Sequence, residues 1–368
     1  MIITQTPLRL SFLGGGTDFP EYYASPANAR GGCCVGAAID KYVYVVAKER
    51  FDDKIYVNYS QKEIVDSDAV GELRHELVRE ALKLTGVAEL IEKTGQGIEI
   101  TTLADVPSEG SGLGSSSAVT VGLLQALWTY RGEIRTAEQL AAEACRIELE
   151  TLGKPMGVQD AYWSAFGGVG QLEFGAAAAT AVGTAPGAGA ARGANVAPHG
   201  KVAHRRLALS PERVSDLSRR LLLFYTHRTR RASSILAGQV RNIPDRMGVL
   251  DKLRDLALEA RERLESPAAD ALDRFGVLLH DGWLLKTQMA DGITDKGVDD
   301  LYAAALDAGA LGGKLAGAGG GGFLLLYVPL GRQDAVRARL NGQVKELPFR
   351  FERDGTKVIF NVRRDPYF

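Results

Sequence analysis

A segment of biased composition near the middle of the chain limits how the rest can fold. Residues 175–200 are mostly alanine and glycine, with few side chains large enough to pack. Such a segment buries too little apolar surface to offset the entropy lost on ordering, so we expect a flexible excursion there. We therefore predict an N-terminal domain over residues 1–175, a flexible segment over 176–204 and a C-terminal domain over 205–368.

The overall composition is that of a globular protein with more than one domain. A chain of 368 residues is long for a single compact core. Apolar residues make up 45% and charged residues 24%, both close to the globular average. The 44 basic and 45 acidic residues give a formal net charge of −1, without a long basic run. We therefore expect no nucleic-acid partner.

Two uncharged stretches, residues 174–191 and 315–331, raise the question of a membrane. Both hold too much glycine, together with proline, to form a spanning helix of adequate hydrophobicity. The N-terminus lacks the charged-then-apolar order of a signal peptide. The three cysteines and five histidines show neither a disulfide framework nor zinc-ligand spacing. We expect a cytoplasmic protein without a membrane partner.

Hydrophobic periodicity predicts a mixture of strands and helices on both sides of the alanine- and glycine-rich segment. Alternating or continuous apolar runs predict strands over 2–12, 38–47, 98–102, 221–226 and 323–328. Helical spacing predicts helices over 70–84, 119–128 and 268–289, and a capping box at 136–139 predicts another. The elements follow no steady βαβ rhythm, so we predict an α+β fold rather than a doubly wound α/β fold.

The C-terminal residues predict a β-hairpin. Apolar residues alternate over 347–351 and again over 358–362, and Asp354-Gly355 lies between the two runs. An Asp-Gly pair between alternating runs is typical of a tight turn that joins two antiparallel strands. We therefore expect these two runs to pair with each other.

The strongest local motif is a Gly/Ser-rich loop in front of a predicted apolar helix. The loop contains Gly110, Gly112, Leu113, Gly114, Ser115, Ser116 and Ser117. Glycines let the backbone approach a ligand, serines supply hydroxyls, and a helix N-terminus adds partial positive charge. The combination suits a polyphosphate, although a flexible turn has the same composition. The loop is not a P-loop, because no Gly-x-x-x-x-Gly-Lys-Ser/Thr sequence occurs.

A second glycine cluster spans residues 312–322. Gly317, Gly319 and Gly322 match the dinucleotide-binding pattern Gly-x-Gly-x-x-Gly. That fingerprint must follow a strand and open a helix, whereas this cluster follows a helical stretch and opens the predicted strand at 323–328. We therefore predict a tight loop that lies against another part of the molecule, where it faces the phosphates held by the first loop.

Four charged residues lie near glycine or proline turns. Arg9 lies on the first predicted strand, and Asp18 follows a glycine turn. They suit phosphate and sugar hydroxyls respectively, or they are a surface residue and a turn former. Glu148 lies on the helix that begins at the capping box, and Asp160 follows a turn at Pro155. These two carboxylates matter for chemistry only if that turn folds Asp160 back toward the Gly/Ser-rich loop.

In this order along the chain, the four motifs resemble those of the GHMP kinases, a superfamily that includes galactokinase, homoserine kinase and mevalonate kinase. The Gly/Ser-rich loop resembles the family's phosphate loop, and residues 315–322 resemble its C-terminal glycine motif. The resemblance covers nearly the whole chain, except residues 175–200. It implies two domains, an N-terminal one like ribosomal protein S5 and a ferredoxin-like C-terminal one. It also implies an ATP-dependent kinase that uses Mg²⁺.

The resemblance implies roles for individual residues. Asp160 resembles the catalytic aspartate, Arg9 the arginine that stabilises charge near the attacking hydroxyl, and Asp18 the aspartate that binds sugar hydroxyls. Ser116 and Glu148 resemble the Mg²⁺ ligands. The remaining implied substrate contacts are Gly15, Gly16, Thr17, Gly317 and Gly319. Asp160 follows Gly157 by three residues, a spacing that galactokinases share and mevalonate kinases shorten.

The N-terminal motif narrows the implied acceptor. Residues 9–20 resemble the branch that phosphorylates anomeric hydroxyls, which contains D-glycero-D-manno-heptose 7-phosphate kinases and L-fucokinases. The chain length favours the heptose branch, because fucokinases often carry a pyrophosphorylase domain. The resemblance then implies conversion of heptose 7-phosphate to the 1,7-bisphosphate, which feeds nucleotide-activated heptose synthesis. Arg228 and Arg230, in the basic stretch 227–231, would bind the 7-phosphate, or the stretch is a solvated helix start.

Other functions are open on the sequence alone. Among kinases, the acceptor could be L-fucose or another free hexose, as in galactokinase. A non-catalytic regulator that binds sugar and nucleotide would share the fold, although it would need Arg9, Glu148 and Asp160 less. A nicotinamide-dependent oxidoreductase is a weaker alternative. We expect the partners to be a sugar phosphate and ATP, and the protein to be a monomer or a homodimer.

Overall fold

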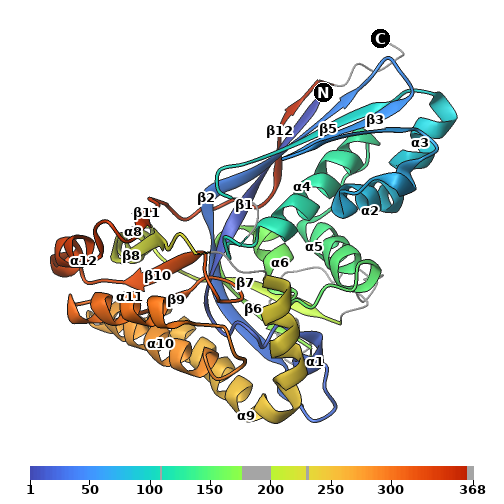
Figure 1. Cartoon of the computed structure of the whole chain (residues 1–368). Coiled ribbons are helices and arrows are strands. Elements are labelled where there is room, and N and C mark those ends of the chain that lie inside the picture. The colour runs from blue at the N-terminus through green and yellow to red at the C-terminus, as the bar shows by residue number, and fades with distance from the viewer. Residues whose placement is uncertain (108–109, 176–199, 229–231, 363–368) are drawn as a thin grey trace.

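The computed structural model describes residues 1–107, 110–175, 200–228 and 232–362 (Figure 1). Within these residues the strands form an eight-stranded sheet and a four-stranded sheet. The larger sheet takes most of its strands from the first part of the chain, and the smaller sheet takes its strands from the second part. No helix in the described ranges is long and apolar enough to cross a lipid bilayer.

The larger sheet is built around two long antiparallel strands, β1 (Ile2–Leu13) and β2 (Gly32–Glu49). Strand β12 (Lys357–Asn361) pairs with the outer edge of β1, and β5 (Ile98–Ala104) pairs with the C-terminal half of β2. The first eight residues of β2 are buried, whereas buried and partly exposed residues alternate farther along. This change follows from coverage, because the N-terminal half is packed on both faces and the rest on one.

The remaining strands extend the larger sheet on both sides of β2. The parallel neighbour of β5 is β3 (Lys54–Asn58), which also pairs with β4 (Lys62–Asp66). The N-terminal half of β2 pairs with β6 (Val169–Phe174), and β6 pairs with β7 (Val202–Arg206). Every pairing except β3–β5 is antiparallel in the described part of this sheet, which confirms the predicted α+β class over a doubly wound parallel sheet.

Helices gather on one face of the larger sheet (Figure 1). The central one is α4 (Ser115–Tyr130), which is apolar on all sides and packs against both β1 and β2. Around it lie α5 (Ala137–Cys145) and α6 (Gln159–Phe166). The shorter helices are α1 (Pro20–Tyr23), the 3₁₀ turn η1 (Val70–Glu72), α2 (Glu76–Thr85) and α3 (Val87–Thr94).

Helix α5 begins where the sequence predicts and ends in an unusual turn. Thr136 accepts a hydrogen bond from the Gln139 amide, and the Gln139 side chain accepts one from the Thr136 amide. The predicted capping box is therefore confirmed. The helix continues as a π-helical turn, η2 (Arg146–Thr151), which contains Glu148. Such turns are rare and frequently occur at functional sites.

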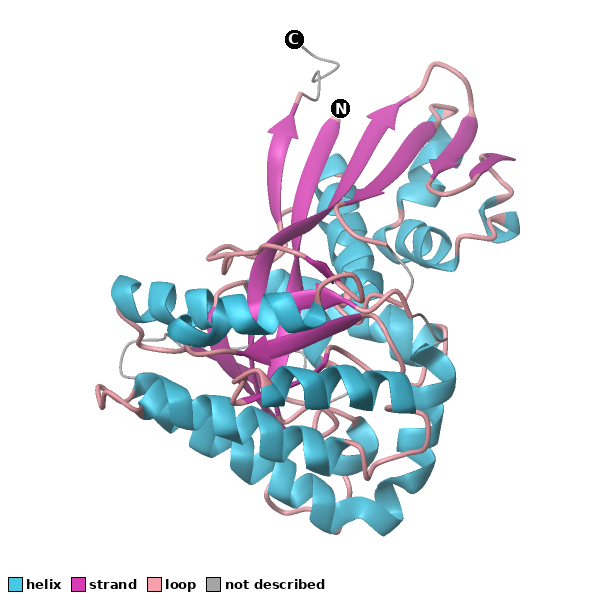
Figure 2. Cartoon of the chain, turned by 60° about the vertical axis from the view of Figure 1, so that its left-hand side comes forward, coloured by secondary structure: helices cyan, strands magenta, loops and turns pink. Residues whose placement is uncertain are grey.

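The smaller sheet is antiparallel, in the order β11 (Lys345–Glu346), β8 (Leu221–Tyr225), β10 (Phe323–Tyr327) and β9 (Gly312–Leu315). Strands β8 and β10 are apolar runs whose side chains are almost all buried, because helices flank this sheet (Figure 2). The helices of this part are α8 (Pro211–Arg220), α9 (Ala232–Glu265), α10 (Ala271–Lys286), α11 (Lys296–Asp307), the 3₁₀ turn η4 (Leu330–Arg332) and α12 (Gln333–Leu340).

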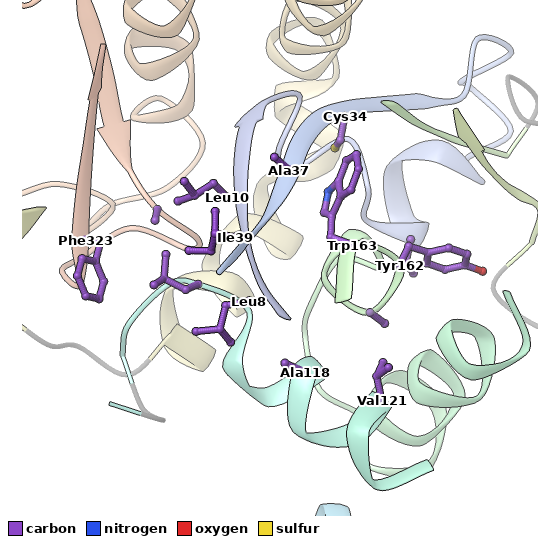
Figure 3. Close-up of a cluster of buried hydrophobic side chains, with 14 of the residues drawn as sticks. Leu8, Leu10, Cys34, Ala37, Ile39, Ala118, Val121, Tyr162, Trp163 and Phe323 are labelled. Atoms are coloured by element: carbon purple, nitrogen blue, oxygen red, sulfur yellow. The ribbon is translucent and has the colours of Figure 1, made fainter. Parts of the chain in front are cut away.

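Helix α9 connects the two sheets, because it packs against α10 and also against β1 and β2. On the same strand β2, Gly36 packs against Trp163 of α6, which is fully buried (Figure 3). A Cβ at Gly36 would lie 3.2 Å from the indole ring and 2.6 Å from the carbonyl oxygen of Leu10. The absence of a side chain at Gly36 therefore lets the largest residue of the core pack directly on the sheet.

The predicted C-terminal hairpin is wrong. Residues 345–346 pair with β8 of the smaller sheet, whereas β12 pairs with β1 of the larger sheet. Between them, Phe351 forms an isolated bridge with Ile39 of β2. The run at 358–362 pairs with the open edge of β1, and the run at 347–351 is bonded to β8 at Leu347 and bridged to β2 at Phe351. The two runs therefore join different strands instead of forming an isolated two-stranded hairpin, which is marginally stable at best.

The predicted flexible segment lies mostly outside the described residues. Residues 176–199 fall in that gap, but the end of the segment, from Val202, forms β7 in the larger sheet. Two strands that follow residue 200, β7 and β12, thus belong to the larger sheet. The division into domains at 175 and 205 stays a prediction.

Two leucines on the larger sheet, one buried and one exposed, test which positions of the sheet contribute to the stability of the protein. Leu8 on β1 is fully buried, whereas Leu103 on β5 is 57% exposed. We expect Leu8→Ala to lower the free energy of unfolding by about 2–5 kcal/mol, because it removes apolar contacts and leaves a cavity. The control Leu103→Ala should change it by less than about 0.5 kcal/mol. Urea unfolding measures both values, and equal losses would contradict this packing.

Candidate active site

A cavity of about 360 Å³ lies between the two parts of the molecule. Its walls come from the end of β1 with the following glycine turn, the Gly/Ser-rich loop, and the residues around Pro155. The second part of the chain adds residues of α9, the end of α10, β9 and the second glycine cluster. The cavity therefore brings together all four motifs that the sequence singled out.

Arg9 and Asp160 form a bidentate ion pair at this cavity. Arg9 projects from β1, and its Nε and Nη2 atoms each donate to one Asp160 carboxylate oxygen at 2.7 Å. The Nη1 atom donates to the carbonyl oxygen of Gly112 at 2.5 Å. The chain turns back after Pro155, so Asp160 at the start of α6 faces the Gly/Ser-rich loop. Such paired hydrogen bonds hold both side chains in one orientation.

The Gly/Ser-rich loop ends at the N-terminus of α4, where no side chain caps the helix. Gly110, Gly112 and Gly114 have positive φ angles of 69°, 74° and 77°, and all three line the cavity with Ser115, Ser116 and Ser117. An uncapped N-terminus of a long helix presents amide groups that suit an anion. Leu113 is instead fully buried in the core and anchors the loop.

The second glycine cluster lies directly against the first loop. A Cβ at Gly317 would lie 2.7 Å from the Cα atom of Gly112, and one at Gly322 would lie 2.5 Å from the carbonyl oxygen of Gly110. The cluster connects the antiparallel strands β9 and β10, so it opens no helix. This geometry excludes a dinucleotide fingerprint and confirms a tight loop packed on another segment, as the sequence predicted.

Glu148 is a buried carboxylate bonded to hydroxyl groups. Its Oε2 atom accepts a hydrogen bond from Ser116 Oγ at 2.7 Å, and its Oε1 atom accepts one from Thr120 Oγ1 at 3.1 Å. Burial raises the pKa of Glu148, and the hydrogen bond from Ser116 opposes the rise. No group of three or more His, Cys, Asp or Glu side chains in the described ranges is arranged so that it could hold a metal ion by itself.

Ser116 and Glu148 nevertheless fit a Mg²⁺ ion. Both present oxygen atoms, and they face the same cavity. Mg²⁺ commonly takes only one or two protein carboxylates and completes its shell with water and substrate phosphates. Glu148 is fully buried and has no cationic partner in hydrogen-bond reach among the residues that the structure describes, which suits such a ligand.

Asp18 is held by backbone amides beside this cavity. Its Oδ1 atom accepts from the Gly16 amide at 2.8 Å, and its Oδ2 atom accepts from the Gln159 amide at 3.4 Å. Burial raises the pKa of Asp18, the Gly16 amide opposes the rise, and the charge of Asp160 adds to it. A Cβ at Gly157 would overlap the Asp18 carboxylate, so the two positions are matched in shape.

Some of the predicted substrate contacts line the cavity and others do not. Gly15, Gly16 and Gly317 line it. Thr17 does not, because its hydroxyl is bonded to the backbone of Gly14 and Cys33 and closes the turn.

Two further candidates for substrate contact also lie away from the lining. Gly319 packs against Ile293. Arg228 is partly exposed and pairs with Asp295 at 3.2 Å, outside the cavity. Arg230 lies outside the described residues.

Sequence reasoning assigned no role to two lysines of the site. Lys286 at the end of α10 and Lys314 in β9 are both buried and line the cavity. Burial lowers the pKa of Lys286 to about 8 and that of Lys314 to about 7. A lysine within an otherwise apolar stretch was the available signal, because lysines are almost never fully buried without a purpose.

Comparisons with known proteins give one family. The family model described as the GHMP kinases N terminal domain matches residues 76–168, and the one described as GHMP kinases C terminal matches residues 267–346.

Several curated relatives are similar over nearly the whole chain, and they include two kinases of sugars or sugar phosphates. One is D-glycero-alpha-D-manno-heptose 7-phosphate kinase of Campylobacter jejuni, 27% identical over 97% of this chain and 98% of the relative. The bifunctional fucokinase/GDP-fucose pyrophosphorylase of Arabidopsis thaliana is 25% identical over 91% of this chain, which spans 30% of that longer protein.

Among solved structures, a D-glycero-D-manno-heptose 1-phosphate kinase from Bacteroides thetaiotaomicron superposes with a TM-score of 0.73. The alignment covers 99% of this chain and 100% of that one, at 23% identity. At this identity the likeness concerns the fold.

The contact between Gly157 and Asp18 leads to a stability prediction. We expect Gly157→Ala to lower the free energy of unfolding by about 1–3 kcal/mol, because the added methyl group overlaps the buried Asp18 carboxylate. Gly248, inside α9, is a matched control, since a Cβ there meets nothing within 4 Å. Gly248→Ala should raise stability by about 0.5–1 kcal/mol. Urea unfolding distinguishes the two, and a neutral Gly157→Ala would contradict the geometry.

Proposed function

Because this chain belongs to the GHMP kinases and is a sugar kinase, we propose that it transfers the γ-phosphoryl group of ATP to the anomeric hydroxyl of a phosphorylated sugar. The first candidate is D-glycero-D-manno-heptose 7-phosphate, which would become the 1,7-bisphosphate. The similarity to the Campylobacter jejuni heptose 7-phosphate kinase supports this acceptor, since it extends over almost the full length of both chains.

The observation that carries the proposal is the ion pair of Arg9 and Asp160 beside the Gly/Ser-rich loop. It places a fixed carboxylate and a guanidinium at the cavity that the uncapped end of α4 also lines. A phosphoryl transfer needs little covalent help from the protein. It depends mainly on positioning of the two substrates and on neutralisation of charge.

The donor would bind along the Gly/Ser-rich loop. The glycines leave room for the polyphosphate, and the amide groups at the start of α4 would donate to its oxygens. Ser116 and Glu148 would hold Mg²⁺ next to these phosphates. When bound, Mg²⁺ supplies charge neutralisation at the transferred group.

The acceptor would bind on the other side of Arg9 and Asp160. In the proposed step, the anomeric oxygen attacks the γ-phosphorus atom, the bond to the β,γ-bridging oxygen breaks, and ADP leaves. The hydroxyl proton passes to Asp160, and Arg9 stabilises the charge of the group in transfer. Asp18 would accept hydrogen bonds from sugar hydroxyls, because its carboxylate is held at the cavity by backbone amides.

Two alternatives have less support. A free-hexose kinase, with L-fucose as the acceptor, is favoured by the similarity to the Arabidopsis thaliana fucokinase, but that relative is much longer than this chain. A non-catalytic regulator would not require Arg9, Asp160 and Glu148 to converge on one cavity.

A single amide substitution tests the role of Asp160. We expect Asp160→Asn to retain ATP binding, because the donor groups are intact, and to lower kcat by about 10²–10⁴-fold. Steady-state kinetics and nucleotide titration measure the two effects. The control Asp300→Asn, at an exposed position on α11, should match the unmodified protein. Unchanged turnover in Asp160→Asn would remove this residue from the proton-transfer role.

Phosphorus NMR tests the acceptor. The protein is incubated with ATP and Mg²⁺ and, in separate samples, with heptose 7-phosphate, L-fucose or galactose. A new anomeric phosphate signal with heptose 7-phosphate alone is the expected result. A signal with a free hexose would keep the kinase and overturn the heptose proposal, and no signal with any sugar would contradict phosphorylation of these acceptors.

A further inference from the structure

Two buried lysines at the cavity have no part in the proposed transfer step. Lys286, the last residue of α10, is 6% exposed, and Lys314 in β9 is 7% exposed. They come from the second part of the chain; Lys286 reaches the glycine turn that follows β1, and Lys314 reaches β1 itself. A buried ammonium group is costly unless it is paired, so its retention at a ligand cavity calls for an explanation.

The partners of both lysines are neutral. Lys286 Nζ donates to the Gly15 carbonyl oxygen at 3.2 Å and to Gln239 Oε1 at 2.6 Å. Lys314 Nζ donates to the Ser11 carbonyl oxygen at 3.0 Å. No carboxylate in the described ranges forms an ion pair with either one. An ammonium group has three donors, so both lysines have at least one left for a ligand.

Two buried polar side chains next to Lys314 lack partners for some of their atoms. Ser11 Oγ and Gln159 Oε1 have no hydrogen-bond partner among the described residues, although both side chains are more than nine-tenths buried. Both residues line the cavity. A Cβ at Gly15 would lie 3.4 Å from Ser11 Oγ, 3.6 Å from Gln159 Nε2 and 3.9 Å from Lys314 Nζ, so these three side chains surround one small space. Buried polar atoms are normally satisfied, which indicates that a polar ligand group completes this space.

Charge interactions link the two lysines to Asp18, Asp160 and Arg9, the groups that we place at the sugar and the transferred phosphoryl group. Asp18 interacts with the charge of Asp160 and also with that of Lys286. Lys314 interacts with Lys286 and with Arg9. A sugar that offers its anomeric hydroxyl to Asp160 and other hydroxyls to Asp18 would therefore extend toward the two lysines.

We propose that Lys286, Lys314 and the Ser11 hydroxyl form an anion subsite that binds the phosphate which the acceptor sugar already carries. This inference rests on the proposed function, and it makes the chain specific for phosphorylated sugars over free ones. It differs from the sequence-based expectation for Arg228, which pairs with Asp295 away from the cavity.

Two buried lysines at one site favour the binding of a doubly negative group such as a phosphate. Burial lowers the pKa of Lys286 to about 8, and burial together with the charges of Lys286 and Arg9 lowers that of Lys314 to about 7. The other ionisable groups that face them are Asp18 and Cys34. A bound phosphate would favour the protonated lysines and so would raise both pKa values.

A phosphoryl group could reach the lysines from the acceptor or from ATP. The neighbours of the lysines favour the acceptor, because Gly15 and Ser11 belong to the sugar side of the cavity with Asp18. The groups that suit the nucleotide phosphates, Ser116 and the start of α4, form no hydrogen bond with either lysine among the described residues. The kinetic constants for the two substrates distinguish these sources.

The test compares Lys286→Met and Lys314→Met with the control Lys252→Met, an exposed position on α9. Each protein is assayed with heptose 7-phosphate and with unphosphorylated heptose, and KM for ATP is measured in parallel. Loss of a charge-assisted hydrogen bond should raise KM for heptose 7-phosphate by roughly 10- to 150-fold. The KM values for free heptose and for ATP should change by less than a factor of about 3, as expected for a substitution that removes no hydrogen bond to these substrates.

Several results would overturn the subsite. A rise in KM for ATP would assign the lysines to the donor, and equal rises for both sugars would make them structural. Equal use of free and phosphorylated heptose by the unmodified protein would leave the kinase intact and reject the subsite.

If no sugar is phosphorylated, the proposed function fails and the subsite is judged by titration calorimetry with inorganic phosphate. Binding that Lys286→Met or Lys314→Met abolishes would support it, and absence of binding to the unmodified protein would reject it. If the methionine variants do not fold, Lys286→Arg and Lys314→Arg take their place. Competition of inorganic phosphate with the acceptor of the unmodified protein is then the deciding measurement.

The pH dependence of binding gives an independent check. Both lysines lose their protons in the free protein as pH rises through about 7 to 8. Affinity for heptose 7-phosphate should therefore be full below this range and fall up to about tenfold per pH unit for each lysine above it. Titration calorimetry at about pH 7 and about pH 9 measures the change, and a flat profile would contradict the proposal.

Discussion

The ion pair between Arg9 and Asp160 is the contact on which the arrangement of the site depends. It joins the central strand β1 to the start of α6, and the same guanidinium group holds the Gly112 carbonyl oxygen of the Gly/Ser-rich loop. A buried ion pair contributes little net stability, because desolvation offsets the Coulomb attraction. Its contribution here is geometric, because it holds β1, the start of α6 and the Gly/Ser-rich loop, which are far apart in the sequence, next to one another at one cavity.

The absence of side chains is as important as the ion pair. The two glycine clusters approach so closely that a Cβ at Gly317 or Gly322 would meet the backbone of the other loop. Asp18 likewise occupies space that a side chain at Gly157 would fill. Because α9 and the smaller sheet supply part of the walls, the cavity exists only when both parts of the molecule pack together.

Burial gives the charged groups of this cavity their unusual properties. The pKa values of Asp18 and Glu148 are raised and those of Lys286 and Lys314 are lowered, in each case mainly because the charged form loses hydration. Groups perturbed in opposite directions and gathered in one cavity are typical of functional sites. Proteins depart from the usual rules of burial mainly at functional sites, and in the proposed function a bound phosphate and Mg²⁺ would supply opposite charges to the lysines and to Glu148.

The sequence by itself determined the main strands and helices, the α+β class and the two glycine clusters, because each depends on periodicity or spacing within a short segment. Tertiary structure decided the rest. The runs at 347–351 and 358–362 have the pattern of a hairpin, but the second pairs with β1 and Phe351 of the first forms a bridge with β2. Thr17 and Arg228 are polar enough to contact a ligand, but Thr17 is hydrogen-bonded to the backbone of Gly14 and Arg228 forms an ion pair with Asp295. Lys286 and Lys314 converge because β9 and α10 pack together, and burial of a side chain depends on residues that no local pattern specifies.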